Sequence, residues 1–242
     1  IGDSLFLAGI LAIVNGLYCL TLPHTPPKRD AARKFALGKV LGMLKDPSFA
    51  TLSLVSFTMM IFASFYYMKT SNFLPTIGIT DRWLSAVMSI GQVMEILTML
   101  LLPWFYRRFG AKTTIAVGLG AWLLRFVVFA VCTHPAPVVA AQALHGFCFA
   151  FAIAAAMIYV ETICSPDVRG SMQSFLGWMM ALGGLLGAYV SGWVHSRFTV
   201  ERGSDWHSIW LVPAAGFVVV LLLFLAGFRA RDAEPVAEPV QS

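Results

Sequence analysis

The feature that most constrains this chain is a series of long apolar runs. Seven segments carry about 20 predominantly apolar residues each, which is the length that a helix needs to cross a bilayer. They lie at residues 4–22, 48–70, 83–106, 112–132, 137–163, 170–196 and 207–228. Hydrophobic residues make up 58% of the 242 and charged residues only 12%, against about 25% charged in a soluble domain. The sequence therefore predicts an all-α membrane protein.

The basic residues are distributed unevenly between the segments that join these runs. Twelve of the 17 Lys and Arg lie in residues 23–47, 107–112, 164–169 and the tail after 228, whereas four lie in the alternate segments. Cytoplasmic loops carry the excess of Lys and Arg in membrane proteins. This rule predicts a multi-pass protein of the cell (inner) membrane with a cytoplasmic C-terminus. It also explains the net charge of +5 without nucleic-acid binding, which we exclude.

The order of the segments indicates a transporter architecture. Residues 1–22 form one helix, 23–47 a long basic loop with prolines and a short amphipathic helix, 48–228 six spans, and 229–242 a polar tail expected to be disordered. Major facilitator transporters join two six-helix halves by such a loop. On this interpretation residues 1–22 are the last, truncated helix of an N-terminal half. The rival interpretation is a seven-helix receptor or rhodopsin, but no Lys lies mid-span in the last run to hold a retinal.

Two charged residues lie in the middle of spans, where charge is costly and therefore indicates function. Glu95 follows Gln92 by three residues, which places both on one helix face. A carboxylate and an amide together can bind a polyhydroxyl or nucleobase ligand, and the carboxylate can carry a proton. Glu95 could instead only pair with Arg125 to fix helix packing. For Arg125 we expect a structural or gating ion pair.

Further candidates combine polar and aromatic side chains. His145 and Phe149 are spaced i, i+4, so they could hydrogen-bond to and stack on a flat ring, or simply pack. Tyr67 belongs to an aromatic group that lines a cavity or forms an interfacial belt. Glu161 and Arg169 flank a short loop, where we expect a gating or bracing ion pair. We expect close helix contact at four small residues of one span, namely Gly183, Gly184, Gly187 and Gly192.

No catalytic or metal-binding motif is present in the sequence. No two cysteines form a CxxC pair, and we interpret all four as small hydrophobic residues, namely Cys19, Cys132, Cys148 and Cys164. There is no HExxH, GxSxG or Ser/His/Asp pattern. We therefore expect neither an enzyme nor a cofactor or metal.

The sequence resembles the nucleoside:proton symporter family of the major facilitator superfamily, C-terminal half. The resemblance is carried by LTLPHTPP, GQVMEILTMLLLPWFYRRFG, AWLLRF, IYVETICSPDVRGSMQSF and DWHSIWLVPA, in this order. It implies uptake of nucleosides with protons, with Gln92 and Glu95 as nucleoside contacts and Glu95 coupling the proton. An aromatic pair of the family falls on His145 and Phe149, where His145 replaces an expected tyrosine.

Other solutes and functions remain open at this point. The region SFYYMKTSN lacks the amides that the family uses there, so a major facilitator symporter for a sugar or other small polar metabolite is an alternative. A non-transporting membrane receptor or scaffold is a second alternative. The partners implied are the solute, protons, the lipid bilayer and a missing N-terminal six-helix half.

Overall fold

The computed structural model describes residues 2–24, 37–165, 168–201 and 203–230. The chain divides into two compact units, Ile1–Phe35 and Ala36–Ser242. The first unit contains helix α1 (Gly2–Cys19), in which the apolar stretch Phe6–Cys19 is shorter than a full span. Most of the predicted loop and tail, residues 25–36 and 231–242, lies outside the described residues.

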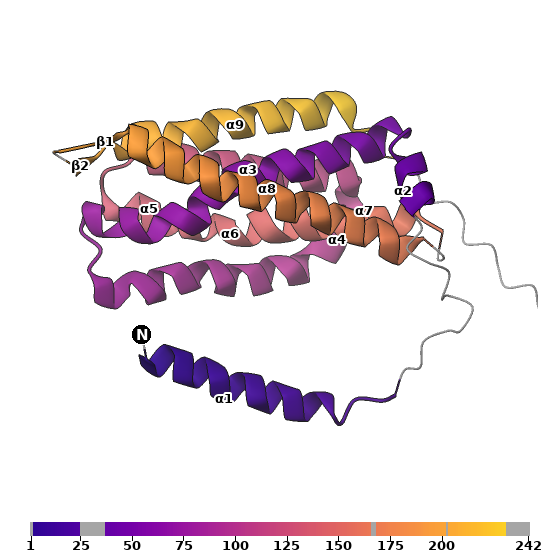
Figure 1. Ribbon diagram of the computed structural model, residues 1–242, viewed down its shortest axis with the longest axis horizontal. Helices are drawn as coiled ribbons and strands as arrows, with labels where there is room; N and C mark the ends of the chain where they lie inside the picture. The colour runs from indigo at the N-terminus through magenta and orange to yellow at the C-terminus, as the bar shows by residue number, and fades with distance from the viewer. Residues whose placement is uncertain (1, 25–36, 166–167, 202, 231–242) are drawn as a thin grey trace, which may run out of the picture. The chain divides into compact units, whose positions relative to one another are not determined.

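The second unit is a bundle of long helices with one small hairpin (Figure 1). Its elements are α2 (Leu37–Met43), α3 (Pro47–Phe73), η2 (Leu74–Ile77), α4 (Asp81–Val131), α5 (Pro135–Gln142), α6 (Leu144–Phe147), η3 (Cys148–Ala154), α7 (Ala155–Ile163), α8 (Arg169–Arg197), β1 (Thr199–Val200), β2 (Gly203–Ser204) and α9 (Trp206–Gly227). Among the described residues, five continuous helical stretches are long and apolar enough to cross a membrane. The six spans predicted between residues 48 and 228 lie within these stretches to within one residue, whereas the span predicted at 4–22 corresponds only to the shorter apolar helix Phe6–Cys19, and the hairpin was not predicted.

Helix α4 contains two of the predicted spans. Its 51 residues would extend about 76 Å if straight, more than twice the hydrocarbon thickness of a bilayer. Gly110 interrupts it with φ 76° and ψ 172°, a conformation that glycine adopts without steric cost. Gly91 before this break and Trp122 after it both lie against His145, so the two halves of α4 run beside the same helix. The spans expected at 83–106 and 112–132 are therefore separated by a turn at one glycine.

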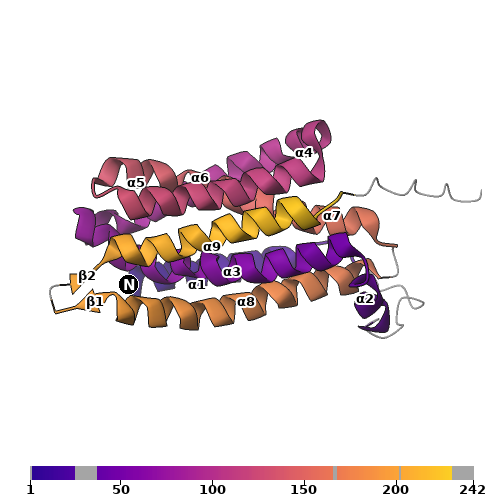
Figure 2. The same cartoon turned by 90° about the horizontal axis from the view of Figure 1, so that it is seen from above.

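Helix α9 packs antiparallel to both α3 and the second half of α4. The hydroxyl of Ser48 donates to the carbonyl oxygen of Arg229 at 2.7 Å, so the start of α3 meets the end of α9. Lys112 Nζ donates to the carbonyl oxygen of Leu225 at 2.9 Å, which pairs the start of the second half of α4 with the same end. Figure 2 shows α9 between these two helices. The ring of Trp122 on α4 stacks on the ring of Phe217 on α9, with the two ring centroids 5.5 Å apart.

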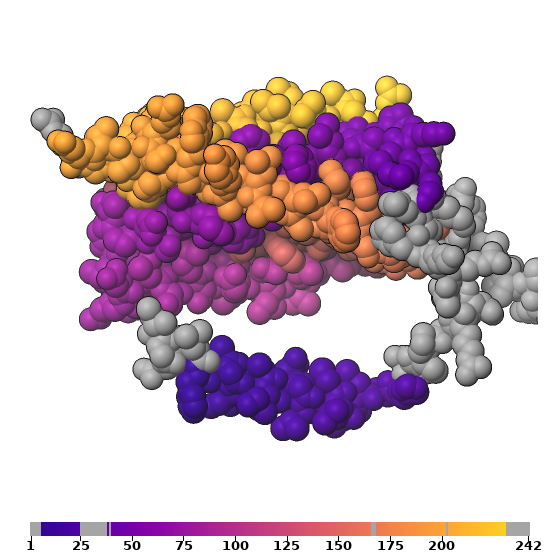
Figure 3. Space-filling view, in the orientation of Figure 1, coloured from indigo at the N-terminus to yellow at the C-terminus, as the bar shows by residue number. Residues whose placement is uncertain are grey.

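Helix α8 approaches α3 closely because glycines lie between them. A Cβ atom on Gly183 would lie 2.2 Å from the carbonyl oxygen of Phe57, and one on Gly187 would lie 2.3 Å from that of Ile61. In Figure 3 the orange atoms of α8 lie directly on the purple atoms of α3. The prediction of close contact is confirmed for these two glycines. Within the described part of the chain it is wrong for Gly192, where a Cβ atom would meet nothing within 4 Å, and a Cβ atom on Gly184 would meet only the end of the Met60 side chain at 3.9 Å.

Candidate functional site

A polar cluster is buried in the middle of the bundle, centred on Arg125. This arginine is fully buried, although it lies midway along the second half of α4. Its Nη1 donates to Nδ1 of His145 at 3.0 Å, and its Nη2 donates to Oε1 of Gln142. Both partners come from the helix that follows, and both are buried. The cluster thus joins two neighbouring spans by polar contacts at membrane depth.

Aromatic rings surround the guanidinium. Its Cζ lies 3.5 Å from the centroid of the Tyr66 ring and 5.7 Å from that of Trp122. The Tyr66 hydroxyl donates to Oε1 of Gln142 at 3.2 Å, so α3 contributes to the same network. A cation over the face of an aromatic ring is stabilised by the quadrupole of the ring, and more so where water is excluded. These rings help to compensate for the burial of the charge.

The structure differs from the ion pair expected for Arg125. Within the described residues no carboxylate lies within 4.0 Å of its guanidinium. The reason is that the His145 ring stands between Arg125 and Glu95, with the Oε2 of Glu95 3.9 Å from Nε2 of His145. An arginine can only donate, so Nδ1 of His145 accepts, and the neutral ring carries its proton on Nε2. The N–H of His145 is therefore on the ring nitrogen nearer to Glu95.

Two donors in the cluster lack an acceptor. Nε of Arg125 and Nε2 of Gln142 are buried and form no hydrogen bond within the described chain. Buried polar groups in folded proteins almost always have partners, and an unsatisfied one costs about 1–3 kcal/mol. The cluster thus holds a buried positive charge without a carboxylate partner among the residues that the structure describes, and the two donors are enclosed by protein.

Other predicted site residues border this cluster on its more open side. The Tyr67 ring is 44% exposed and lies 6.3 Å from the His145 ring, and the Glu95 side chain is 27% exposed. Gln92 is exposed one turn before Glu95, and Phe149 is half-buried within η3. Contacts therefore bring Glu95, His145, Tyr67 and Arg125 together. For Gln92 and Phe149 only their position on the same helices links them to the cluster.

Small residues and a local change of helix type position His145. A Cβ atom on Gly146 would lie 2.4 Å from the carbonyl oxygen of Met94, so the backbones of α6 and α4 nearly touch at this level. Directly after, residues 148–154 of η3 adopt π-helical geometry, which is rare and often found at functional sites. The close contact brings His145 next to the turn that carries Glu95.

The second predicted ion pair lies away from this cluster. Nη1 of Arg169 donates to Oε1 of Glu161 at 3.3 Å, across the loop between α7 and α8. Both side chains are about half exposed, at 40% for Arg169 and 50% for Glu161. Exposed pairs of this kind contribute about 0–1 kcal/mol, so this one suits a reversible contact better than a permanent brace.

Three members of the cluster were not predicted from the sequence, namely Gln142, Tyr66 and Trp122. Gln142 had a signal, because it precedes His145 by three residues, the same spacing that singled out Gln92 and Glu95. Tyr66 and Trp122 could not be told from ordinary packing aromatics by position alone. Among the described residues no group of three His, Cys, Asp or Glu could hold a metal ion.

Comparisons with known proteins agree on a family of transporters. A family model described as nucleoside H⁺ symporter matches residues 3–233. The nucleoside permease NupG of Escherichia coli (strain K12) is 30% identical over 246 residues, which cover 94% of this chain and 59% of the permease. The xanthosine permease of the same organism is 27% identical, over 93% of this chain and 58% of its own. The chain thus spans a little under three fifths of the length of these relatives.

Solved structures show the same relationship in three dimensions. A crystal structure of the nucleoside transporter NupG matches with a TM-score of 0.72 and 27% identity, covering 94% of this chain and 60% of NupG. A bacterial homologue of the human lysosomal transporter Spinster matches with a TM-score of 0.55 and 14% identity, which supports the fold alone. The likeness to NupG confirms the predicted all-α membrane fold.

Proposed function

Because this chain belongs to the nucleoside H⁺ symporter family, we propose that it is part of a permease that takes up nucleosides together with protons. The family is one of transporters, not of enzymes. Uptake, substrate and coupling are proposed for the full-length protein, since the chain spans only about 59% of NupG. In this proposal the C-terminus is cytoplasmic, and the bundle alternates between outward-open and inward-open states around a central site.

The placement of Glu95 is the observation that carries the proposal. It is the only acidic residue in the middle of a span within the described chain, and its side chain is partly open beside a buried cation. His145 presents its Nε2–H towards Glu95 while its Nδ1 is occupied by Arg125. With Nδ1 occupied, the histidine has no free lone pair for a second proton. Glu95 is therefore the group that takes up and releases the coupled proton.

The same surroundings suit a nucleoside. Glu95 and Gln92 offer acceptors and donors to ribose hydroxyls and base edges, and His145 adds a polar contact. Tyr67 and Phe149 offer aromatic faces on which a base can stack, an interaction of about 1–3 kcal/mol per base. Protonated Glu95 can donate to the solute, whereas ionised Glu95 is drawn towards His145 and Arg125.

Uptake of radiolabelled uridine into proteoliposomes by the full-length parent tests this proposal. An inward proton gradient should drive accumulation, and Glu95→Gln should abolish accumulation while uridine exchange at equal pH persists. Asp81→Asn removes an exposed carboxylate at the start of α4 and serves as the matched control. Normal gradient-driven accumulation by Glu95→Gln would refute the role of Glu95. Competition by glucose but not by adenosine would instead support the sugar alternative, and binding without uptake would support a receptor.

A further inference from the structure

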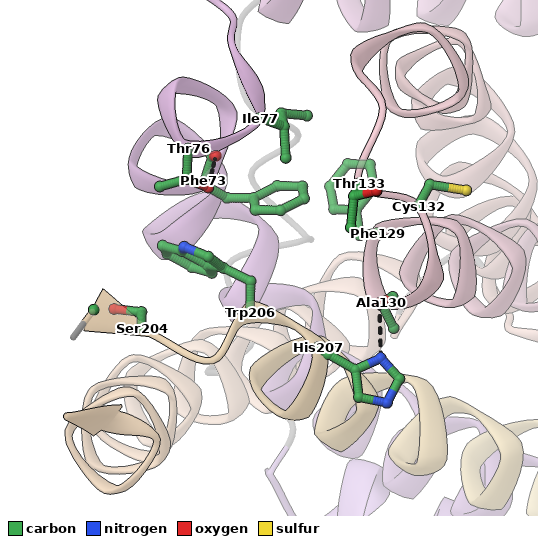
Figure 4. Close-up of a pocket in the computed structure, with 11 residues that line it drawn as sticks. Phe73, Thr76, Ile77, Phe129, Ala130, Cys132, Thr133, Ser204, Trp206 and His207 are labelled. Atoms are coloured by element: carbon green, nitrogen blue, oxygen red, sulfur yellow. Dashed lines mark hydrogen bonds between the residues drawn. The ribbon is translucent and has the colours of Figure 1, made fainter.

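A pocket opens at one end of the bundle, away from the turn at Gly110. It has a volume of about 410 Å³ and lies between the end of α3 and η2, the end of α4, the hairpin and the start of α9 (Figure 4). Small-molecule sites in proteins usually measure about 300–1,000 Å³. None of the predicted site residues lines this pocket. Its size suits a solute of the dimensions of a nucleoside.

Three aromatic rings form much of its wall. Phe73 and Phe129 extend towards each other with ring centroids 5.6 Å apart, and Trp206 lies 5.4 Å from Phe73 (Figure 4). These rings come from three different helices, α3, α4 and α9. Aromatic faces attract flat heterocycles of any identity, because every base has a π-face.

The polar part of the lining consists mainly of hydroxyl groups. Thr76, Thr133 and Ser204 contribute hydroxyl groups, and the Thr76 hydroxyl donates to the carbonyl oxygen of Phe73 at 2.6 Å, which leaves its oxygen free to accept. His207 is held in place by its Nδ1, which donates to the carbonyl oxygen of Ala130 at 2.9 Å. Among the described lining residues there is no Asp, Glu, Lys or Arg. A phosphate or an amino-acid zwitterion would find no counter-charge here, whereas a neutral solute with a flat ring and hydroxyls is matched.

The pocket adjoins the central cluster without being part of it. Phe129 lines the pocket and also lies 5.6 Å from Cζ of Arg125. Along α3, Phe73 of the pocket follows Tyr66 of the cluster by seven residues, which corresponds to about 10 Å of helix. The pocket lies at the end opposite to the basic segments near Arg108 and Arg229, the end that the positive-inside rule places outside the cell.

We propose that this pocket is an outer binding site, where a nucleoside rests its base against Trp206 before it moves to the central cluster. This inference rests on the proposed function and adds a second substrate site to it. The hydroxyls of the pocket face the ribose.

Cys132, which lines the pocket and is partly exposed, provides a direct reporter. The experiment measures the rate of maleimide alkylation at Cys132 by peptide mass spectrometry in the purified full-length parent, with and without uridine. Uridine should slow the alkylation, and ribose at the same concentration should not, because the base carries the recognition. The protection should persist in Glu95→Gln, since the pocket does not contain Glu95.

Substitutions in the pocket complete the test. Trp206→Leu should raise the uridine concentration for half-protection about fivefold or more, through lost stacking. Thr133→Val is an isosteric substitution at an exposed residue, so it should weaken protection with little effect on folding. Trp193→Leu, an exposed tryptophan on α8 outside the pocket, should leave protection unchanged.

Several results would overturn the outer site. These are absence of protection in the wild type, equal protection by ribose, loss of protection in Glu95→Gln, or unchanged protection in both Trp206→Leu and Thr133→Val. Failure of the proposed function is separate, because it appears as absence of proton-driven uridine uptake. Protection of Cys132 can be measured whatever the outcome of that assay.

Discussion

At the scale of single residues, the central site depends on an arginine that is buried without a carboxylate. Arg125 is held by one nitrogen of His145, one oxygen of Gln142 and the face of Tyr66. Two hydrogen bonds from one planar group require a guanidinium, since a lysine ammonium is a point charge without the fork geometry. The geometry of the site, and not only its charge, therefore depends on this residue.

Arg125→Lys tests this dependence. We expect it to leave either Nδ1 of His145 or Oε1 of Gln142 without its donor, at a cost of about 1–3 kcal/mol in the free energy of unfolding. Thermal unfolding of the detergent-purified protein, followed by intrinsic fluorescence, measures the loss, and uridine affinity should fall with it. Arg197→Lys, at an exposed arginine at the end of α8, is the control and should change neither. An unchanged melting temperature for Arg125→Lys would contradict the assignment.

Sequence reasoning singled out Glu95, Arg125 and His145, but not the contacts between them and not Gln142. Glu95 and Arg125 stood out because charge at membrane depth is rare. Their relation was not predictable, because it depends on the rotation of two helices that places His145 between them. Whether Gln92 and Phe149 contact substrate stays a prediction.

At the scale of elements, glycines determine which helices can touch. Gly183 and Gly187, one turn apart on α8, bring its backbone against the carbonyl groups of α3. Such small-residue contacts replace the hydrophobic effect as a source of helix association in lipid, because packing and close polar contacts supply the energy there. This contact also holds α3 in the position from which Tyr66 reaches the site.

Gly187→Leu should separate α8 from α3, since even a Cβ atom at this position would lie 2.3 Å from a backbone oxygen. We expect a loss of several kcal/mol in stability, as for overpacking of a tight core, with loss of monodisperse protein in gel filtration. Gly192→Leu, on the same helix with open space around it, is the matched control and should behave as the wild type. Equal behaviour of the two variants would show that the contact does not stabilise the bundle.

The spans were predictable within a few residues because apolar length is a strong signal. Apolar length alone does not predict where these helices are interrupted. The turn at Gly110 was placed between two spans from the charges of Arg107 and Arg108, whereas the π-helical turns of η3 have no sequence signal that we could identify. The hairpin of β1 and β2 is too short to show a strand pattern.

At the scale of the whole molecule, the arrangement of charge predicts the orientation in the membrane. The loop before α3, the turn at Gly110, the loop before α8 and the residues after α9 carry most of the Lys and Arg. The hairpin and the pocket lie at the other ends of these helices. The positive-inside rule therefore predicts that the pocket opens at the outer side of the membrane.

Site-directed labelling in whole cells checks this orientation. In a parent with Cys132 replaced by Ala, Glu201→Cys in the hairpin turn should react with a membrane-impermeant maleimide from outside. Arg108→Cys, beside Gly110, should react only after the cells are permeabilised. The reversed pattern would place the C-terminus outside and the pocket at the cytoplasmic face.

The contact between α3 and α8 also constrains how solutes and lipids can reach the interior. Where a carbonyl group of one helix occupies the space of a missing side chain on the other, no slot remains wide enough for a lipid tail or a nucleoside. The interface between α3 and α8 therefore leaves no room for lateral entry along the turn between Gly183 and Gly187. Any lateral opening into the bundle must lie between other helices.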